Sequence, residues 1–189
     1  MTNKSNFDMK KVKVYIIANI HPSRHNYIEK VCSKLNSDFE LFKPHVDNEY
    51  NLNNSKIEFG AFYKDKVEMD KAEISLVIMP LFGRDCACEI GYSRGIGNCV
   101  IAWVDKMESK QEQDWLNDWM VKGFIDYIIT PNKKSYKLLS NNPLILEKQQ
   151  FEKQFGKKKV VYFLNFWQDL SEMISQILIE RKNLKRCKE

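Results

Sequence analysis

The pattern of apolar and polar positions along the chain predicts alternating strands and helices. Short apolar runs rich in β-branched residues predict strands, and stretches with one apolar face at helical spacing predict helices. The runs at 74–79 and 99–104 are almost continuously apolar, which is typical of central strands in a parallel sheet. Strands are expected at 12–18, 39–42, 74–79, 99–104 and 127–130.

Helices are expected between these strands, from Pro22 to about Leu35 and at 59–72, 89–96 and 115–122. The segment 82–88 is expected to be a loop, and 160–163 and 166–182 are candidates for a last strand and a closing helix. Strands that alternate with helices predict βαβ units. The expected fold is α/β and doubly wound, a flavodoxin/Rossmann-like, mainly parallel five-stranded sheet flanked by helices.

Composition supports one domain of ordinary size. The chain has 189 residues, and its 43% hydrophobic content is enough for a core. Residues 1–11 are polar and are expected to be disordered, and 12–189 are expected to form a single domain. From about residue 131 the chain is weakly patterned and rich in lysine, so this C-terminal extension has no predicted place in the fold.

Charge and cysteine content point to a cytoplasmic protein without nucleic-acid or membrane partners. The net charge of +5 comes from 30 basic and 25 acidic residues, which are well mixed. The basic runs at 157–159 and 181–188 are best explained as solvated surface. No apolar run approaches the ~20 residues of a membrane helix, and the N-terminus lacks the apolar core of a signal peptide. Five cysteines without paired CxxC motifs suit a reducing compartment.

The segment after the third expected strand is the most informative for chemistry. In open parallel sheets, ligands bind at the carboxyl ends of the strands. Glu89 follows this strand and is expected in the first turn of a helix, where the helix N-terminus would hold its carboxylate ionised and suit it to be a nucleophile. Local features alone also fit an ordinary first-turn glutamate.

Three other kinds of site fit the sequence less well. Cys88 is a possible nucleophile of a cysteine hydrolase, but the sequence places no histidine beside it. The histidines and the CxC motif lack the usual spacing of a zinc site, so no metal is expected. The glycines do not form a GxGxxG motif after the first strand, which argues against a dinucleotide cofactor. The residues considered for metal are His21, His25, His45, Cys86 and Cys88.

Several short motifs occur in the order in which one enzyme family has them. They are VKVYIIA at 12–18, HPSRHN at 21–26, VDNEY at 46–50, Asp65 within a helix, EIGYS at 89–93 and WLNDWMVKG at 115–123. Together they cover about residues 12–130. In this ordered set the chain resembles the nucleoside 2-deoxyribosyltransferase family, and residues after 130 have no counterpart.

The resemblance implies a role for each matching residue. Glu89 would attack the anomeric carbon of a 2′-deoxynucleoside and form a covalent deoxyribosyl-enzyme. Tyr15 would hold Glu89, and Asp65 would lie near the sugar and base. Asp85 is the candidate acid for the leaving base, since a dry pocket would raise its pKa. The family has an aspartate six residues before the nucleophile, where this chain has Gly83. The substrate-binding candidates are His21, Glu49, Gly83, Asp118 and Met120.

The resemblance also implies partners and leaves alternatives. The expected partners are a 2′-deoxynucleoside and a nucleobase, with no cofactor, and a homo-oligomer with shared active sites in which Asp118 and Met120 complete a neighbour's site. Glu49 stands where the family often has glutamine and accepts hydrogen bonds only, which favours a purine such as adenine. One alternative is a 2′-deoxynucleoside 5′-phosphate N-glycosidase, and another is a non-catalytic nucleotide-binding domain. The candidate phosphate ligands of the glycosidase are Ser23, Arg24, Ser93 and Arg94.

Overall fold

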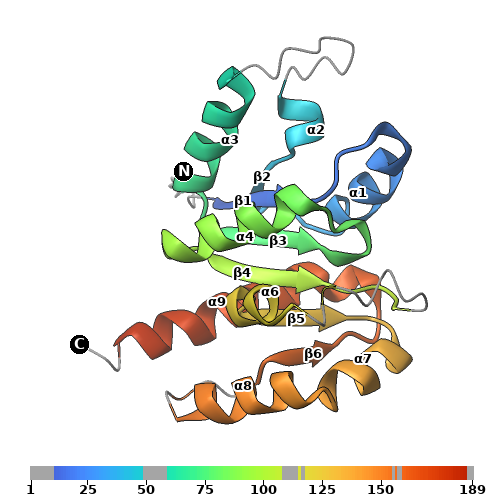
Figure 1. Cartoon of the computed structure of the whole chain (residues 1–189), viewed down its shortest axis with the longest axis vertical. Helices are drawn as coiled ribbons and strands as arrows, with labels where there is room; N and C mark the ends of the chain where they lie inside the picture. Colours follow the sequence, from blue (N-terminus) through green and yellow to red (C-terminus); the bar gives the residue numbers. More distant parts are fainter. Residues whose placement is uncertain are drawn as a thin grey trace, which may run out of the picture.

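The described residues form a parallel sheet of six strands (Figure 1). The structure, a computed structural model, describes residues 11–48, 59–107, 115, 118–154, 156 and 159–186. The strands are β1 (Val12–Ile17), β2 (Phe39–Phe42), β3 (Ile74–Ile78), β4 (Cys99–Trp103), β5 (Tyr127–Thr130) and β6 (Val161–Phe163). Their order is β2-β1-β3-β4-β5-β6, and every neighbouring pair is parallel. The expected doubly wound α/β fold is confirmed.

The sheet has one strand more than the five that were predicted. β6 pairs with β5 and forms the edge opposite β2. Its three residues carry too little pattern to be separated from a loop by sequence alone. The central strands β3 and β4 are buried at every position, in agreement with their continuous apolar character.

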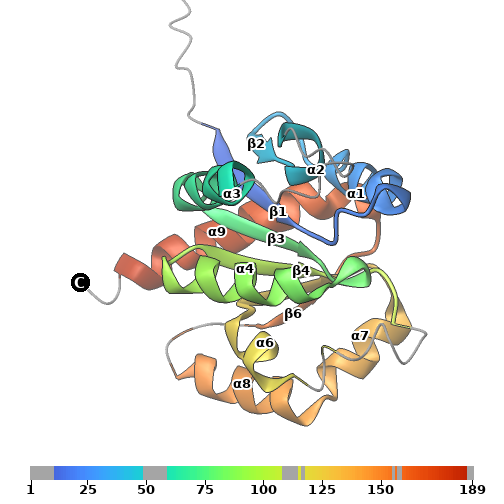
Figure 2. The same ribbon diagram turned by 45° about the horizontal axis from the view of Figure 1, so that its top comes forward.

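Helices cover both faces of the sheet. One face carries α3 (Phe59–Lys71), α4 (Arg84–Gly95), α6 (Trp119–Phe124), α7 (Lys133–Ser140) and α8 (Pro143–Lys153). The other face carries α1 (His25–Cys32) and α9 (Leu170–Arg186). Figure 2 shows α4 in front of the strands and α9 behind them. Short helical turns are η1 (Pro22–Arg24), α2 (Pro44–Asp47), η2 (Met79–Leu81) and η4 (Trp167–Asp169).

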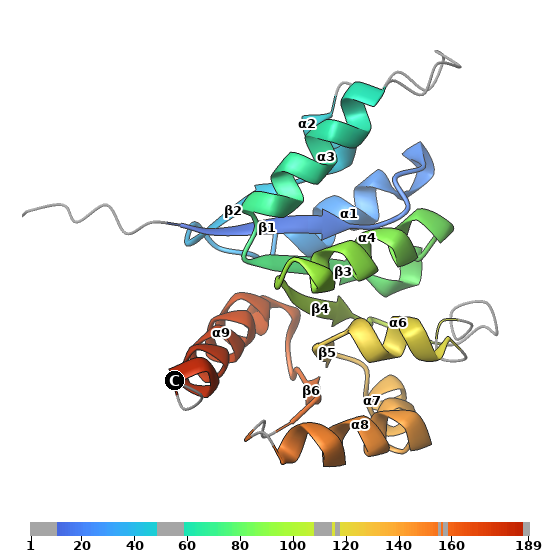
Figure 3. The ribbon, with the colours of Figure 1, turned by 60° about the vertical axis from the view of Figure 1, so that its left-hand side comes forward.

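The segment after residue 131, which the sequence left without a place, is an integral part of the fold. Asn132 and Asn142 cap α7 and α8, since each side chain accepts hydrogen bonds from the first helical amides. α9 lays Leu170, Ile174 and Ile177 against the sheet. α8 lies at the β6 end of the molecule and α3 at the β2 end (Figures 1 and 3). None of the described helices combines the length and apolarity needed to cross a bilayer.

Candidate active site

The loops after β1 and β3 meet where the strand order reverses. Asn19 donates its backbone N–H to the Leu81 carbonyl at 2.7 Å, and its Oδ1 accepts from the His21 amide at 3.1 Å. A Cβ on Gly83 would lie 3.2 Å from the Asn19 side-chain nitrogen. Glycine at 83 therefore allows the two loops to approach closely. Ligands of doubly wound folds bind at such a reversal of strand order.

Tyr15 lies in a row of side chains that crosses three strands beneath α3 and α4. The strand register pairs it with Phe42 of β2 and Ser75 of β3. The Phe42 ring stacks on Tyr15, with centroids 5.5 Å apart and planes at 16°. The Tyr15 hydroxyl donates to Glu89 Oε1 at 3.1 Å, so the contact implied by the resemblance is present.

α4 begins five residues earlier than the sequence predicts. The segment expected as a loop contains the first turn of the helix, which starts at Arg84 with Gly83 at its N-cap. No glycine or proline from 84 to 88 stops it. Glu89 therefore lies in the second turn, beyond the reach of the helix-terminus effect, which falls off within the first turn.

A chain of buried hydrogen bonds fixes α3 and α4 over the sheet. Ser75 Oγ donates to Ser93 Oγ at 2.8 Å, and Ser93 Oγ approaches Met69 Sδ at 3.6 Å. Ser93 lies one turn after Glu89 on α4, and Met69 lies one turn after Asp65 on α3. Residues four apart share a helix face, so these hydrogen bonds hold both carboxyl groups over β1.

Asp65 completes a cluster of two carboxyl groups joined by a phenol. Its carboxyl group interacts with Tyr15, whose pKa it helps to raise, and accepts from Asn48 Nδ2 at 2.6 Å. Both Asp65 and Glu89 are half-buried, while Tyr15 and Asn48 are buried. The Tyr15 hydroxyl thus connects a carboxyl group on α3 with one on α4.

Burial governs the protonation of this cluster. It raises the pKa of Glu89 to about 8, with a further rise from Asp65 and Asp85 that the Tyr15 hydrogen bond opposes. Burial also raises the pKa of Asp65, and the interactions with Tyr15 and Asn48 oppose this rise. The prediction that the helix N-terminus holds Glu89 ionised is therefore wrong, because Glu89 lies in the second turn of α4 and desolvation outweighs the groups that favour its charge. Near neutral pH the two carboxyl groups retain a proton.

Asp85 does not occupy the dry pocket that was predicted for it. Its side chain is exposed in the first turn of α4, four residues before Glu89. Its effect on the site is electrostatic, through Glu89.

The cysteines and histidines lie in separate environments. Burial raises the pKa of the Cys86 thiol to about 12, and Cys88 is exposed on α4. His45 contacts Glu29 Oε1 at 2.9 Å and packs on the His25 ring at 4.7 Å. Among the described ranges, no three His, Cys, Asp or Glu side chains are grouped to hold a metal ion.

The remaining predicted binding residues are spread along the chain. His21 is exposed and caps η1 by accepting from the Ser23 amide. Asp118 caps α6, with Oδ1 accepting from the amides of Met120 and Val121 at 2.9 and 3.0 Å. Met120 and its neighbour Trp119 are exposed. Glu49 lies outside the described residues.

The candidate phosphate ligands are not brought together as a set. Ser93 is fully buried and hydrogen-bonded to Ser75, and Arg94 pairs with Asp126 at 3.5 Å. Two residues that touch the cluster were missed by the sequence reasoning. Phe42 follows from the strand register, and Asn48 lies inside the VDNEY motif, but a single sequence does not show that either faces the cluster.

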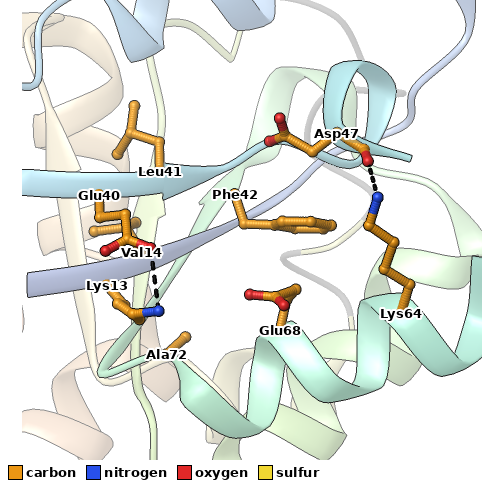
Figure 4. Close-up of a pocket in the computed structure, with 9 residues that line it drawn as sticks. All are labelled: Lys13, Val14, Glu40, Leu41, Phe42, Asp47, Lys64, Glu68 and Ala72. Carbon is orange, nitrogen blue, oxygen red and sulfur yellow. Dashed lines mark hydrogen bonds and ion pairs between the residues drawn. The ribbon is translucent and has the colours of Figure 1, made fainter. Parts of the chain in front are cut away.

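A separate hollow of about 320 Å³ lies next to this cluster, at the β2 edge (Figure 4). Phe42 lines it and also stacks on Tyr15. Its other lining residues are Lys13, Val14, Glu40, Leu41, Asp47, Lys64, Glu68 and Ala72. Lys13 pairs with Glu40 at 3.1 Å, and Lys64 donates to the Asp47 carbonyl. Tyr15, Asp65 and Glu89 are not among its lining residues, so the hollow is distinct from the cluster.

Together these features define a doubly wound α/β protein with a carboxyl–phenol–carboxyl cluster beside its reversal of strand order. No protein-family model matches the chain, and no curated protein matches it in sequence. Among solved structures, the chain is similar to the crystal structure of a conserved protein from Enterococcus faecalis V583. That similarity has a TM-score of 0.47 and 15% identity, and it covers 88% of this chain and 98% of the other.

Proposed function

We propose that the protein is a nucleoside 2-deoxyribosyltransferase that moves 2-deoxyribose between nucleobases, most readily purines. The observation that carries the proposal is the cluster of Glu89, Tyr15 and Asp65. A half-buried carboxyl group tied to a phenol, with a second carboxyl group beside it, offers both a nucleophile and an acid for a glycosidic bond. The ordered motifs of the sequence support the same reaction.

In the first half-reaction, Glu89 attacks the anomeric carbon of the deoxynucleoside. A new bond forms from a Glu89 carboxylate oxygen to this carbon, and the carbon–nitrogen bond to the base breaks. The base leaves with the electron pair of that bond and needs a proton. The enzyme must therefore supply one ionised carboxylate and one proton at the same moment.

Tyr15 allows one proton to satisfy both needs. When Glu89 holds the proton, it donates to the Tyr15 oxygen and the hydroxyl donates to Asp65. A shift along these bonds leaves Glu89 ionised, with the Tyr15 hydroxyl donating to it, and leaves Asp65 protonated. The 3.1 Å contact between the Tyr15 hydroxyl and Glu89 Oε1 supplies one step of this path. Asp65 then gives its proton to the leaving base, the role earlier assigned to Asp85.

The second half-reaction reverses these steps with another base. Its nitrogen attacks the anomeric carbon of the deoxyribosyl-Glu89 ester, the ester bond breaks, and the proton of the acceptor nitrogen returns to Asp65. Each cycle thus restores one proton to the pair. Exposed Trp119 and Met120 on α6 suit a subunit contact, and we propose a homo-oligomer in which this segment reaches a neighbouring site.

Base exchange tests the proposal directly. Incubation with deoxyinosine and adenine is expected to yield deoxyadenosine and hypoxanthine. Chromatography of the reaction mixture measures both products. Glu89→Gln is expected to abolish exchange, while the matched variant Glu147→Gln on the exposed face of α8 retains it. Release of hypoxanthine without deoxyadenosine would indicate a hydrolase. Absence of any turnover would indicate a binding protein, and either result overturns the transferase proposal.

A further inference from the structure

Two consecutive residues at the end of α2 join two consecutive residues of α3. Lys64 donates to the Asp47 carbonyl (Figure 4), and Asn48 Nδ2 donates to Asp65 Oδ1 at 2.6 Å. We infer that Asn48 is a positioning residue that holds the Asp65 carboxyl group in register with Tyr15. Its effect on turnover rests on the proposed function, whereas its effect on the titration of Asp65 does not.

α2 is held firmly enough to position a side chain. The backbone N–H of Lys43 donates to Asp47 Oδ2 at 2.6 Å, which closes the short helix on itself. The Lys43 ammonium contacts both Glu29 carboxylate oxygens at 3.0 Å. His45 contacts the same carboxylate from a nearly buried position. Asn48 therefore extends from an element fixed to α1 on one side and to α3 on the other.

The Asn48 side chain makes an incomplete set of hydrogen bonds. It is 7% exposed, and in the described part of the chain its Oδ1 is buried without a hydrogen-bond donor. An unpaired buried carbonyl oxygen costs about 1–3 kcal/mol. An apolar side chain of the same branching would avoid this cost. The amide is therefore poorly explained by stability alone and well explained by the bond to Asp65.

That bond also decides which Asp65 oxygen is free to carry a proton. Because Oδ1 accepts from Asn48, a proton on Asp65 belongs on Oδ2. The other groups that act on the cluster are Tyr15 from β1, Glu89 and Asp85 from α4, and Lys64 from α3 itself. Of the residues that the structure describes, Asn48 is the neutral donor to Asp65 Oδ1.

The test compares Asn48→Leu with Asn98→Leu. Asn98 is 5% exposed and donates to the Met69 carbonyl at 2.9 Å, so it is a buried amide outside the cluster. Asn48→Leu is expected to keep or raise the melting temperature yet lower kcat/KM by roughly tenfold or more, the value of a hydrogen bond to a charged group. Asn98→Leu is expected to lower the melting temperature by about 4 °C or more and leave the pH profile unchanged.

Carboxyl ¹³C NMR titration provides a readout that does not depend on turnover. Loss of the amide donor is expected to raise the pKa of Asp65 in Asn48→Leu and to leave it unchanged in Asn98→Leu. Should Asn48→Leu fail to fold, Asn48→Asp replaces the amide with a second carboxyl group beside Asp65. This variant is expected to raise the pKa of Asp65 further. An unchanged Asp65 titration in the folded Asn48 variant overturns the inference, even if base exchange is observed. A shifted titration supports it, even if exchange is absent.

Discussion

Replacing Glu89 with glutamine is expected to remove a pH-dependent loss of stability. The folded protein raises the pKa of Glu89 from 4.5 to about 8, mainly by burial. The folded state therefore binds a proton more tightly than the unfolded chain between these values. Glu89 therefore does not destabilise the fold below about pH 4.5, and it lowers the free energy of unfolding increasingly as pH rises toward 8. Glutamine has nearly the same shape and does not ionise.

The size of the effect follows from the same pKa values. A difference of about 3.5 between the folded and unfolded pKa corresponds to an upper limit of about 5 kcal/mol, at ~1.4 kcal/mol for each pH unit. Glu89 is only half-buried, so solvent screening reduces this to roughly 2–3 kcal/mol. The Tyr15 hydroxyl retains an acceptor in the glutamine carbonyl, which preserves the observed hydrogen bond.

Urea unfolding followed by circular dichroism at about pH 5 and pH 8 measures this difference. We expect Glu89→Gln and the wild type to have similar free energies of unfolding near pH 5, and the variant to be more stable by roughly 2–3 kcal/mol near pH 8. Glu147→Gln, on the exposed face of α8, is expected to follow the wild type at both values. A stability difference between Glu89→Gln and wild type that is the same at both pH values would refute the assignment of a buried, proton-binding Glu89.

Three further outcomes follow from the same geometry. The pH profile of kcat/KM is expected to be bell-shaped, since the pair of Glu89 and Asp65 must hold one proton; activity falls above about pH 8 as that proton is lost and falls in acid as a second proton binds. An activity that continues to rise past pH 9 contradicts this. Tyr15→Phe is expected to lower kcat by about 10–100-fold with little change in KM, because the proton path is broken but binding is not; steady-state kinetics with unchanged kcat would remove the hydroxyl from the mechanism. Gly83→Val is expected to destabilise the fold by about 1–3 kcal/mol through its contact with the loop after β1, whereas Gly95→Val, which meets nothing within 4 Å, serves as the thermal-denaturation control.

The strands of the sheet were predictable because burial on both faces leaves a strong local signal. The sequence at 74–79 and 99–104 shows this burial directly, and β3 and β4 are found there. Of the three helices after residue 131, α7 and α8 were not predicted. α8 buries Ile145 but leaves Leu144, Leu146 and Phe151 exposed, so the hydrophobic pattern that marks an amphipathic helix is weak in this segment.

The candidate site, like the fold, could be predicted only in part from the sequence. The contact between Tyr15 and Glu89 was predictable from the order of motifs, since the resemblance implied it. The protonation state of Glu89 was not predictable, because it depends on where α4 begins and on the desolvation of the side chain between two helices. Asn48 contacts a residue 17 positions away, and nothing in its local sequence indicates which side of α2 it faces.

The cost of the cluster to stability is itself an argument for function. Several buried polar groups of the core are paired at ordinary distances, such as Ser75 with Ser93, and Asp126 with the Val100 amide at 3.0 Å, whereas His45 Nδ1 and Trp115 Nε1 are buried without a partner among the described residues. Beside the reversal of strand order, two carboxyl groups have raised pKa values and the Asn48 oxygen has no donor. Two carboxyl groups with raised pKa values and an amide oxygen without a donor, gathered in one cluster, therefore favour the proposal that this cluster carries the chemistry.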